Sequence, residues 1–381
     1  MEILHVIKTK RIESDGRLLK WVNTLSNYQI KSAILALEDS NSCRKTDSDI
    51  DIQSTCLKSR KFYSQRKGYW IKVPEYLINV FFRIYKSKAD AILFHDVQQY
   101  LNLIVFCMLK KIKVFSPLLI WDLHELPHNG LLHNKVTARI LNFLLENIDL
   151  VIYTNEERRQ YLKEKLNQDE KKFFILNNFP DDTFINNPYQ PLKDELLTWL
   201  NGMPYILWMG IASKKRNFQS LIEVYSKYTT KFKIIIMGDV SPEFDKIVNS
   251  YIKEQLIYAT FVSQNEVQQF VDNALFSIVL YANDSPNNFY CEPNRLYQLI
   301  VRRIPIISGC NPVMARTVKE FNAGLILNDD GKSSVNLDIK INQMLSDFSH
   351  FRQNMKTTDV SPLSWDKQFA SIYTSLSDIN L

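Results

Sequence analysis

The sequence predicts an α/β protein built from two doubly wound, Rossmann-like domains that face each other across a cleft. Short apolar segments alternate with amphipathic segments along the chain, which is the pattern of parallel sheets covered by helices. A stretch rich in proline, asparagine and aspartate at residues 177–204 interrupts this pattern once, and the pattern then starts again. The chain has 381 residues, and a single core stops growing at about 250–300 residues, which also favours two domains.

The first domain is expected to contain short apolar strands joined by helices with one apolar side. The strands are expected at residues 3–7, 31–37, 91–94, 118–121, 150–153 and 173–176, and the helices at residues 17–27, 97–111, 135–146 and 156–166. Residues 39–60 are polar and are expected to form a loop.

The second domain repeats this design. Its strands are expected at residues 205–209, 232–237, 258–262, 276–280 and 305–308, and its helices at residues 218–228, 245–253, 266–273 and 294–301, with a last helix at 365–376. We therefore expect a first domain over residues 1–180, a linker over 181–203, a second domain over 204–350, and a C-terminal helical segment over 351–381 that packs back toward the first domain.

The composition excludes several classes of protein. With 45% hydrophobic and 23% charged residues, the chain can form packed cores, so collagen-like, low-complexity and disordered proteins are excluded. The net charge of +6 suits an anionic partner, but no nucleic-acid-binding module is recognisable, so nucleic acid is not expected as a partner. The 9 glycines are about a third of the usual share, and neither a GxGxxG nor a P-loop pattern is present.

One segment, at residues 58–85, is both basic and aromatic. Between Asp51 and Glu75 there are six basic residues, four interleaved aromatic residues and no acidic residue, and an apolar stretch follows at 76–85. This mixture suits a surface that contacts anionic headgroups or a lipid-linked acceptor. A solvated loop followed by an ordinary buried helix would have the same composition, so both interpretations stay open.

The cysteines and the apolar runs bear on location. Five cysteines (Cys43, Cys56, Cys107, Cys291 and Cys310) are widely spaced and form no CxxC pair, so neither a zinc site nor a disulfide framework is expected. The first residues run from apolar to basic, the reverse of a secretory signal. No apolar run approaches the ~18 residues of a membrane-spanning helix. We expect a cytoplasmic protein that can associate with the inner face of the cell membrane.

Residues at strand ends are the candidate site residues, because ligands of doubly wound domains bind beyond the carboxyl ends of the strands. After the first strand, Asp15 and Gly16 open a helix, where Asp15 is expected as an N-cap and a binding role stays open. His95 and Asp96 follow a later strand. Asp96 and Gln99 have the spacing of a capping box, which leaves His95 available at the cleft.

The most specific motif of the first domain follows the strand at residues 118–121. The strand runs directly into Asp122, His124 and Glu125, and strand alternation places Asp122 and His124 on one face. A histidine among carboxylates can hold a substrate hydroxyl or exchange a proton near neutral pH. The structural alternative is a histidine that only donates a hydrogen bond to a backbone carbonyl.

The second domain has a cluster of cations at the start of a helix. Gly210 ends an apolar strand, and Lys214, Lys215, Arg216 and Asn217 follow just before a helix. A helix start offers free N–H groups and a positive dipole end, which disfavours cations unless an anion binds there. This cluster therefore points to a bound diphosphate.

Three further motifs bear on anion and metal binding. Gly238 repeats the strand-to-glycine design, and Pro293 opens another helix whose first turn carries Asn294 and Arg295, again suited to an anion. Residues 47–51 contain the DxD pattern of metal-dependent sugar transfer, but no apolar strand precedes them. No metal site is therefore expected.

Together these motifs resemble the GT-B glycosyltransferases, most closely the GT4-like group that assembles bacterial surface polysaccharides such as capsule and lipopolysaccharide. The resemblance covers nearly the whole chain. It is carried by DLHE (122–125), ENIDLVIYTNEERR (146–159), ILNNFP (175–180), MGIASKKRN (209–217), EPNRLYQLIVRRIPIIS (292–308) and SWDKQFASIYTSL (364–376). The order and spacing of these motifs are specific for the fold and the superfamily, but not for a sugar.

The resemblance implies that the second domain binds a nucleotide-sugar as co-substrate, with no other cofactor, and that the first domain binds the acceptor. The implied donor-binding residues are Gly210, Lys215, Arg216, Asn217, Gly238, Asn294, Arg295 and Gln298. The implied catalytic residues are His124, which lines the donor sugar in the family, with Glu125, Asp122 and Glu292. The implied acceptor-binding residues are Asp15, Gly16, His95 and Asp96, and no metal ligand is implied.

The sequence departs from the family at one motif. The family often carries two glutamates spaced as Glu-x7-Glu, of which the second holds the ribose and the first contacts the sugar. Tyr290 and Gln298 stand at these positions here. Gln298 can still bond ribose hydroxyls, and Glu292 is the candidate substitute for the missing carboxylate on the sugar.

We therefore expect metal-independent transfer of a sugar, with retention of anomeric configuration, to a polysaccharide, oligosaccharide or lipid-linked acceptor in cell-surface glycan synthesis. Asp96, Asp122 and Glu125 remain candidate bases for an inverting reaction. Two other functions stay open: a nucleotide-sugar epimerase of the same fold, and a non-catalytic subunit of an envelope assembly complex, which the altered glutamate pair would suit.

Overall fold

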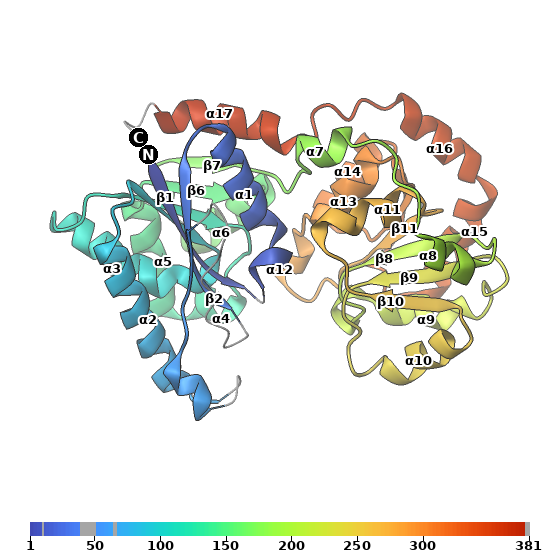
Figure 1. Ribbon diagram of the computed structural model, residues 1–381, viewed down its shortest axis with the longest axis horizontal. Helices are drawn as coiled ribbons and strands as arrows, with labels where there is room; N and C mark the ends of the chain where they lie inside the picture. The colour runs from blue at the N-terminus through green and yellow to red at the C-terminus, as the bar shows by residue number, and fades with distance from the viewer. Residues whose placement is uncertain (10, 39–50, 64–66, 378–381) are drawn as a thin grey trace. The chain divides into compact units, whose positions relative to one another are not determined.

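The structure, a computed structural model, describes residues 1–9, 11–38, 51–63 and 67–377. The chain divides into two compact units, drawn in Figure 1. The first unit consists of Met1–Asn177 with Asp366–Leu381, and the second of Asn178–Trp365. Each unit is built around one parallel sheet.

The sheet of the first unit has seven strands in the order β3-β2-β1-β4-β5-β6-β7, all paired in parallel. The strands are β1 (Glu2–Thr9), β2 (Lys31–Glu38), β3 (Asp51–Ser54), β4 (Ala91–His95), β5 (Leu118–Leu123), β6 (Leu150–Tyr153) and β7 (Phe173–Ile175). The chain runs from β1 outward to β3, returns to β4 and continues in the opposite direction, so the sheet is doubly wound about β1 and β4.

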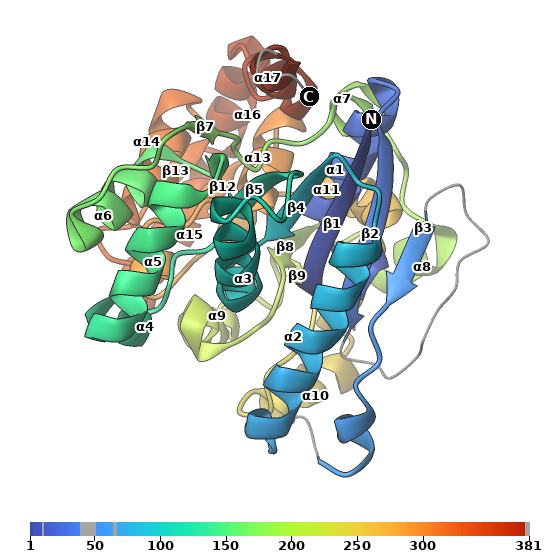
Figure 2. The ribbon, with the colours of Figure 1, turned by 90° about the vertical axis from the view of Figure 1, so that its left-hand side faces the viewer.

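Helices cover both faces of this sheet. They are α1 (Gly16–Asn27), α2 (Tyr69–Lys86), α3 (Tyr100–Lys111), α4 (Asn129–His133), α5 (Lys135–Asn147), α6 (Glu156–Leu166) and α17 (Trp365–Ser377). Right-handed crossovers place α1 on one face and α2, α3 and α5 on the other, where Figure 2 shows them in a row.

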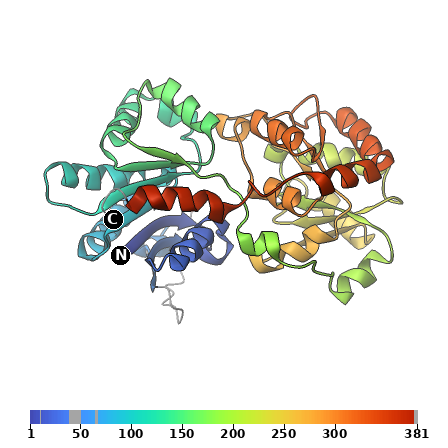
Figure 3. The ribbon, with the colours of Figure 1, turned by 90° about the horizontal axis from the view of Figure 1, so that it is seen from above.

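The C-terminal helix α17 belongs to the first unit from Asp366 onward. Phe369 packs edge-on against Trp21 of α1, and Tyr373 stacks on Tyr28, which caps α1, with a centroid distance of 4.1 Å. Figure 3 shows α17, in red, beside the blue N-terminal elements. The two ends of the chain thus share one core.

The sheet of the second unit has six parallel strands in the order β10-β9-β8-β11-β12-β13. The strands are β8 (Tyr205–Met209), β9 (Lys233–Met237), β10 (Ile257–Thr260), β11 (Ser277–Val279), β12 (Ile306–Ser308) and β13 (Gly324–Ile326). The helices are α7 (Asp182–Asn186), α8 (Asp194–Leu200), α9 (Phe218–Tyr225), α10 (Asp245–Lys253), α11 (Val267–Asp272), α12 (Pro286–Phe289), α13 (Asn294–Val301), α14 (Pro312–Glu320), α15 (Ser334–Ser346) and α16 (Phe348–Thr357).

The central strands are continuous apolar runs because helices cover both of their faces. In β9, Ile234 and Ile236 belong to one apolar core, whereas Ile235 between them belongs to the core on the other side of the sheet. All three side chains are fully buried. The strand orders of the two parallel sheets confirm the predicted fold class, two doubly wound sheets covered by helices.

The structure differs from the expected elements in several places. The polar segment expected as a loop at 39–60 contains β3, a half-exposed edge strand, and a short 3-10 helix, Lys58–Lys61. Residues 181–203 contain α7 and α8 and lie within the second unit. Among the described residues, no helix is long and apolar enough to span a membrane.

The cysteines also differ from expectation. Cys107, Cys291 and Cys310 are free thiols, whereas Cys56 is disulfide-bonded. The expectation, drawn from the spacing of the cysteines, that there is no disulfide framework therefore missed the disulfide at Cys56.

Candidate active site

Two arginines of the second unit converge on the end of its central strand. Gly210 follows β8, Arg216 ends a short 3-10 helix (Lys214–Arg216), and Arg295 lies in the first turn of α13. Both guanidinium groups lie against the ring of Tyr281, with Cζ 5.0 Å and 4.8 Å from its centroid, respectively. Arg216 Nη1 also donates to the carbonyl of Met209 at 3.3 Å.

Arg295 is a buried cation with unused donors. Its side chain is 7% exposed, and neither Nε nor Nη2 has a hydrogen-bond partner among the described residues. Burial, and after it the charge of Arg216, lower its pKa to about 10. Because an unpaired buried charge is costly, this arrangement is suited to receiving an anion.

Two glycines allow close packing at this site, Gly210 against the arginines and Gly238 against the backbone of Gly210. Gly210 has φ +93°, and a Cβ atom on it would lie 2.1 Å from Arg216 Nη1 and 2.8 Å from Arg295 Nη1. Gly238, which follows β9 with φ +145°, would place a Cβ 2.7 Å from the carbonyl carbon of Gly210. Both positions therefore require glycine for space as well as for backbone conformation.

The other predicted donor residues lie nearby in sequence but differ in what they contact. Lys215 is exposed, and its carbonyl accepts the N–H of Ala282 at 2.9 Å. The side chain of Asn217 donates to the carbonyl of Asp330 at 2.8 Å, so it holds a loop. Asn294 and Gln298 are both half-buried and one helical turn apart on α13, on the same side.

Glu292, the candidate substitute carboxylate, is buried at the approach to α13. Tyr297 hydrogen-bonds to its carboxylate, and the backbone carbonyl of Glu292 accepts from Asn178 at 3.0 Å. Oε2 is a buried oxygen with no hydrogen-bond partner in the described residues. Part of the hydrogen-bonding capacity of this carboxylate is thus used inside the second unit.

In the first unit, Asp122 is the centre of a buried charged network at the end of β5. Arg17 of α1 binds both carboxylate oxygens, with Nη2–Oδ1 at 2.6 Å and Nε–Oδ2 at 2.8 Å, and Trp21 Nε1 donates to Oδ2 at 3.1 Å. Burial alone would raise the pKa of Asp122, but the charge of Arg17 and a hydrogen bond from His95 hold it well below the usual value. Asp122 therefore stays ionised and is a poor base.

The same carboxylate organises two histidines. His95 Nδ1 lies 3.1 Å from Asp122 Oδ2, and His95 Nε2 lies 3.0 Å from His5 Nδ1, with the two rings stacked. His5 Nε2 in turn lies 3.3 Å from Ser32 Oγ. Because His95 is 1% exposed and both of its ring nitrogens are bonded, the expectation that it is available at the cleft is wrong.

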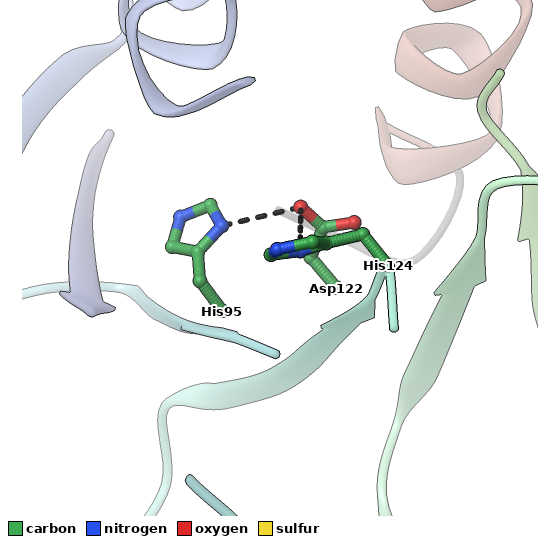
Figure 4. A group of neighbouring side chains, drawn as sticks. All are labelled: His95, Asp122 and His124. Carbon is green, nitrogen blue, oxygen red and sulfur yellow. Dashed lines mark hydrogen bonds and ion pairs between the residues drawn. The ribbon is translucent and has the colours of Figure 1, made fainter. Parts of the chain in front are cut away.

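A cation site is the first alternative to test for this cluster. One nitrogen or oxygen from each of His95, Asp122 and His124 lies within 4.8 Å of the others. Figure 4 shows the three side chains turned toward one another. However, Arg17 and Trp21 already occupy the carboxylate oxygens. A divalent cation would lie against the guanidinium, so the residues do not fit a metal ion. Of the DxD pattern, residues 47–50 lie outside the described residues.

His124 lies at the accessible side of this network. Its Nδ1 is 3.9 Å from Asp122 Oδ2 and has no hydrogen-bond partner in the described part of the chain, while the side chain is partly exposed. Its backbone carbonyl accepts from the guanidinium of Arg158, a buried residue of α6 that also bonds Thr154. His124 thus offers a ring to a ligand from a backbone that is held in place.

Two further carboxyl groups flank His124. Asp96 is buried, has a left-handed φ of +68°, and its Oδ1 has no hydrogen-bond partner among the described residues. Burial raises its pKa to about 6. Glu125 reaches solvent, yet partial burial and the charge of Asp96 raise its pKa as well. Their raised pKa values make these two carboxyl groups better suited than Asp122 to accept a proton at this edge.

Of the two predicted helix caps, the one at Asp15 is confirmed and the one at Asp96 is wrong. Asp15 accepts the N–H of Leu18 at 3.1 Å and is the N-cap of α1, which begins at Gly16, as predicted. Asp96 makes no such cap, and Gln99 bonds Tyr76 and Asn102 instead, so the predicted capping box is wrong.

Sequence reasoning missed Arg17, Trp21, His5, Arg158 and Tyr281. A signal for Arg17 existed, because it is a cation in the first turn of a helix, the same unfavourable position that singled out Arg216. His5 and Trp21 gave no signal, since a residue in an apolar strand or on the buried side of a helix is expected in the core.

Comparison with known proteins places the fold. No family model matches the chain, and no curated protein matches it in sequence. Solved structures do match. Sucrose-phosphate synthase from Thermosynechococcus elongatus is similar over 99% of both chains, with a TM-score of 0.72 at 12% identity. The chain has the GT-B fold.

Two other solved structures with this fold are informative. Anabaena HepE has been solved in complex with UDP and also with UDP and glucose. The UDP complex is similar over 99% of this chain and 100% of the HepE chain, with a TM-score of 0.68 at 13% identity. WaaG, a glycosyltransferase involved in lipopolysaccharide biosynthesis, is similar over 97% of this chain and 99% of its own, with a TM-score of 0.65 at 11% identity. At these identities the likeness concerns the fold alone.

Proposed function

We propose that this protein transfers a sugar from a nucleotide-sugar donor to a glycan or lipid-linked acceptor in cell-surface polysaccharide synthesis. The observation that carries the proposal is the pair of arginines at Gly210. Arg295 is a buried cation whose Nε and Nη2 have no hydrogen-bond partner in the described residues, and Arg216 lies against the same tyrosine ring. A nucleoside diphosphate supplies the two adjacent anionic groups that such a pair binds.

The arginines also suit the chemistry of the reaction. When the bond between the sugar and the diphosphate breaks, negative charge develops on the leaving diphosphate. Donors fixed in advance around that charge stabilise the transition state, and such an effect is usually the largest in catalysis. Arg216, Arg295 and the free N–H groups at the start of α13 would do this work, which supports a metal-independent reaction.

The solved structures of the same fold support the identity of the donor. HepE was solved with UDP and glucose, and the trehalose-phosphate synthase of Burkholderia vietnamiensis is described as UDP-forming. Gln298, half-buried one turn after Asn294 on α13, is the candidate for the ribose hydroxyls.

The first unit supplies the groups proposed for the sugar and the acceptor. His124 offers the exposed part of its ring, with Glu125 beside it, and Asp15 and Gly16 lie at the start of α1. Asp122 acts through its hold on Arg17 and His95 rather than on the substrate. A lipid-linked acceptor would be met at a membrane surface, and the segment at 58–85 is the part of this unit suited to such contact.

The resemblance to retaining enzymes supports retention of the anomeric configuration. An inverting reaction would need a carboxylate that accepts the acceptor's proton, and the low pKa of Asp122 makes it unsuited to this role. Asp96 and Glu125 remain as the groups to test. We expect a product of retained configuration by NMR, and transfer that persists in Asp96→Asn. An inverted product together with loss of transfer in Asp96→Asn would replace retention by inversion.

A donor panel tests the function itself. Thermal unfolding would be followed with UDP-, GDP-, CMP- and ADP-sugars, and the donor that raises the melting temperature would then be assayed for hydrolysis and transfer. In Arg216→Ala we expect both the shift and the turnover to be lost, whereas Lys246→Ala, which removes an exposed cation of α10, should behave like wild type. Undiminished turnover in Arg216→Ala would refute the assignment.

The same assay separates the other two functions. Conversion of the donor into an epimer without transfer would indicate an epimerase. Binding of no nucleotide-sugar at all would indicate a non-catalytic subunit.

A further inference from the structure

Helix α2 exposes apolar side chains from its first turn to its last. Ile78, Phe82 and Tyr85 are spaced by four and three residues and therefore form a stripe on one side of the helix, and each is more than half exposed. Tyr69 and Trp70, in the first turn, extend this exposed stripe at its N-terminal end, and Trp70 is 75% exposed.

The opposite side of α2 is an ordinary core contact. Val80 and Ile84 are fully buried, and Phe81 stacks on Phe106 of α3. This helix is thus apolar on two sides, of which only one packs against the rest of the unit. A buried helix of a soluble domain needs only the inward side to be apolar, so the outer stripe calls for a separate explanation.

The stripe continues beyond α2. Tyr85 and Val114 line the same open hollow of about 960 Å³, at the end of the sheet where its strands begin. Met108 and Ile112, which lie one turn apart at the end of α3, are more than half exposed too. We call this surface the α2 face; it consists of Phe62, Tyr69, Trp70, Ile78, Phe82, Tyr85, Met108, Ile112 and Val114.

Positive charge surrounds the α2 face. Residues 58–88 contain nine lysines and arginines and one acidic residue, Glu75. The carboxylate of Glu75 accepts the backbone N–H groups of Lys58 and Ser59, so it is engaged in a cap. The exposed cations include Lys61, Lys67, Arg83, Lys86 and Lys88, with Lys111, the last residue of α3, and Lys113.

We propose that the α2 face binds the surface of a bilayer that contains anionic lipids. Helix α2 lies along the surface, its apolar side chains enter the boundary between headgroups and acyl chains, and the flanking lysines and arginines contact lipid phosphates. Tryptophan and tyrosine at the ends of the stripe suit this boundary, because their rings are apolar with one polar atom. A second copy of the chain is a poorer occupant, since two faces of the same positive charge would repel.

The role of this contact rests on the proposed function, because a lipid-linked acceptor would be presented at the same surface. The contact itself does not, since binding to lipid can be measured without donor or turnover.

The test is co-sedimentation of the full chain with vesicles of phosphatidylcholine, alone or mixed with phosphatidylglycerol. We expect binding to the anionic vesicles that is at least about tenfold stronger than to the neutral ones and that weakens in high salt. Trp70 fluorescence should shift to shorter wavelength on binding, and Trp70→Phe should remove that shift.

Matched variants decide whether the α2 face is responsible. The double variant Trp70→Ser and Phe82→Ser should lower vesicle binding about tenfold. The control, Val335→Ser and Ile339→Ser, removes two apolar side chains of α15 that are similarly exposed, at 67% and 58%, and should bind like wild type. Because all four side chains are exposed, circular dichroism should show an unchanged fold.

Equal vesicle binding by the two double variants would overturn the proposal. So would a wild-type protein that binds anionic vesicles no more strongly than neutral ones. Self-association lost in the Trp70 and Phe82 variant would assign the α2 face to a second copy instead. Donor-induced thermal shifts, measured on the same proteins, report on the proposed function separately. Vesicle binding without any donor shift would refute the function and leave the membrane contact standing.

Discussion

The two units each bury a charged side chain at the carboxyl edge of their sheet, and they treat it in opposite ways. Asp122 in the first unit is fully buried and is bonded by Arg17, Trp21 and His95. Arg295 in the second unit is 7% exposed, lacks a hydrogen-bond partner at two of its nitrogens among the described residues, and has another arginine as its charged neighbour.

This difference distinguishes a structural charge from a ligand-binding charge. A buried charge whose partners are all supplied by the protein contributes to the fold. Removing one member of such a pair destabilises the protein, because the other charge stays buried without a partner. A buried charge without partners weakens the free protein and gains its partner on binding. A buried charged residue at the end of a strand therefore indicates a binding group only when the protein itself leaves some of its hydrogen-bonding atoms without partners.

The largest expected effect is on stability in Arg17→Met. The change leaves Asp122 ionised and buried without its main partner, and we expect the free energy of unfolding to fall by about 3–5 kcal/mol. Urea unfolding followed by circular dichroism measures this. Arg83→Met, which removes an exposed arginine of α2, serves as the control. If Arg17→Met lowers the free energy of unfolding no more than Arg83→Met does, the burial of Asp122 does not depend on its ion pair with Arg17.

In Arg295→Met the expectation is reversed. Because the variant removes an unpaired buried charge, the melting temperature without ligand should stay the same or rise, while donor turnover falls about 100-fold. Differential scanning fluorimetry and the transfer assay measure the two effects on one preparation. Lower stability with unchanged turnover would mean that Arg295 belongs to the fold, like Asp122.

A smaller effect is expected in Gly210→Ala. The new Cβ would meet Arg216 Nη1 and Arg295 Nη1, so both guanidinium groups must move and donor affinity should fall about tenfold. Gly202→Ala is the matched control, because Gly202 also has a positive φ, +77°, but nothing lies within 4 Å of its added Cβ. Both variants should lose similar stability from backbone strain. Equal donor affinity in the two, by calorimetry, would remove the steric argument.

The smallest effect concerns pH. The pKa of Asp122 is lower in the folded protein than in the unfolded chain, where it is about 3.9. The ionised carboxylate therefore stabilises the folded protein above about pH 4, and this contribution is lost as the pH falls through the pKa of the folded state. The difference in unfolding free energy between wild type and Asp122→Asn should therefore narrow below about pH 4. For Arg295→Met the difference should stay constant between pH 4 and 8, since the pKa of Arg295 is about 10. A pH series of urea unfolding curves tests both.

The sequence predicts the donor edge better than the acceptor edge. Gly210, Arg216 and Arg295 follow from local patterns: a strand that ends on glycine and cations at helix starts, where the dipole disfavours them. The bonds of Asp122 do not follow from such patterns. Arg17 and Asp122 are 105 residues apart, and only the packing of α1 beside β5 brings them together.

Two elements show the limits of local patterns. Strand β3 lacks an apolar alternation because it is a half-exposed edge strand, so a polar segment was expected to be a loop. In α2 the apolar residues extend around the helix, and a buried helix was one open interpretation. Only the exposed fraction of each side chain distinguishes the stripe from the core side.

The hydrogen-bonded row from Ser32 through His5 and His95 to Asp122 crosses four neighbouring strands, β2, β1, β4 and β5. An ionised carboxylate can only accept, so with both histidines neutral His95 carries its proton on Nδ1 and accepts at Nε2. His5 must then carry its proton on Nδ1, and Ser32 must donate to Nε2. One carboxylate thus fixes both tautomers, and the imidazole nitrogen resonances of His5 and His95 become reporters of the ion pair in the middle of the sheet.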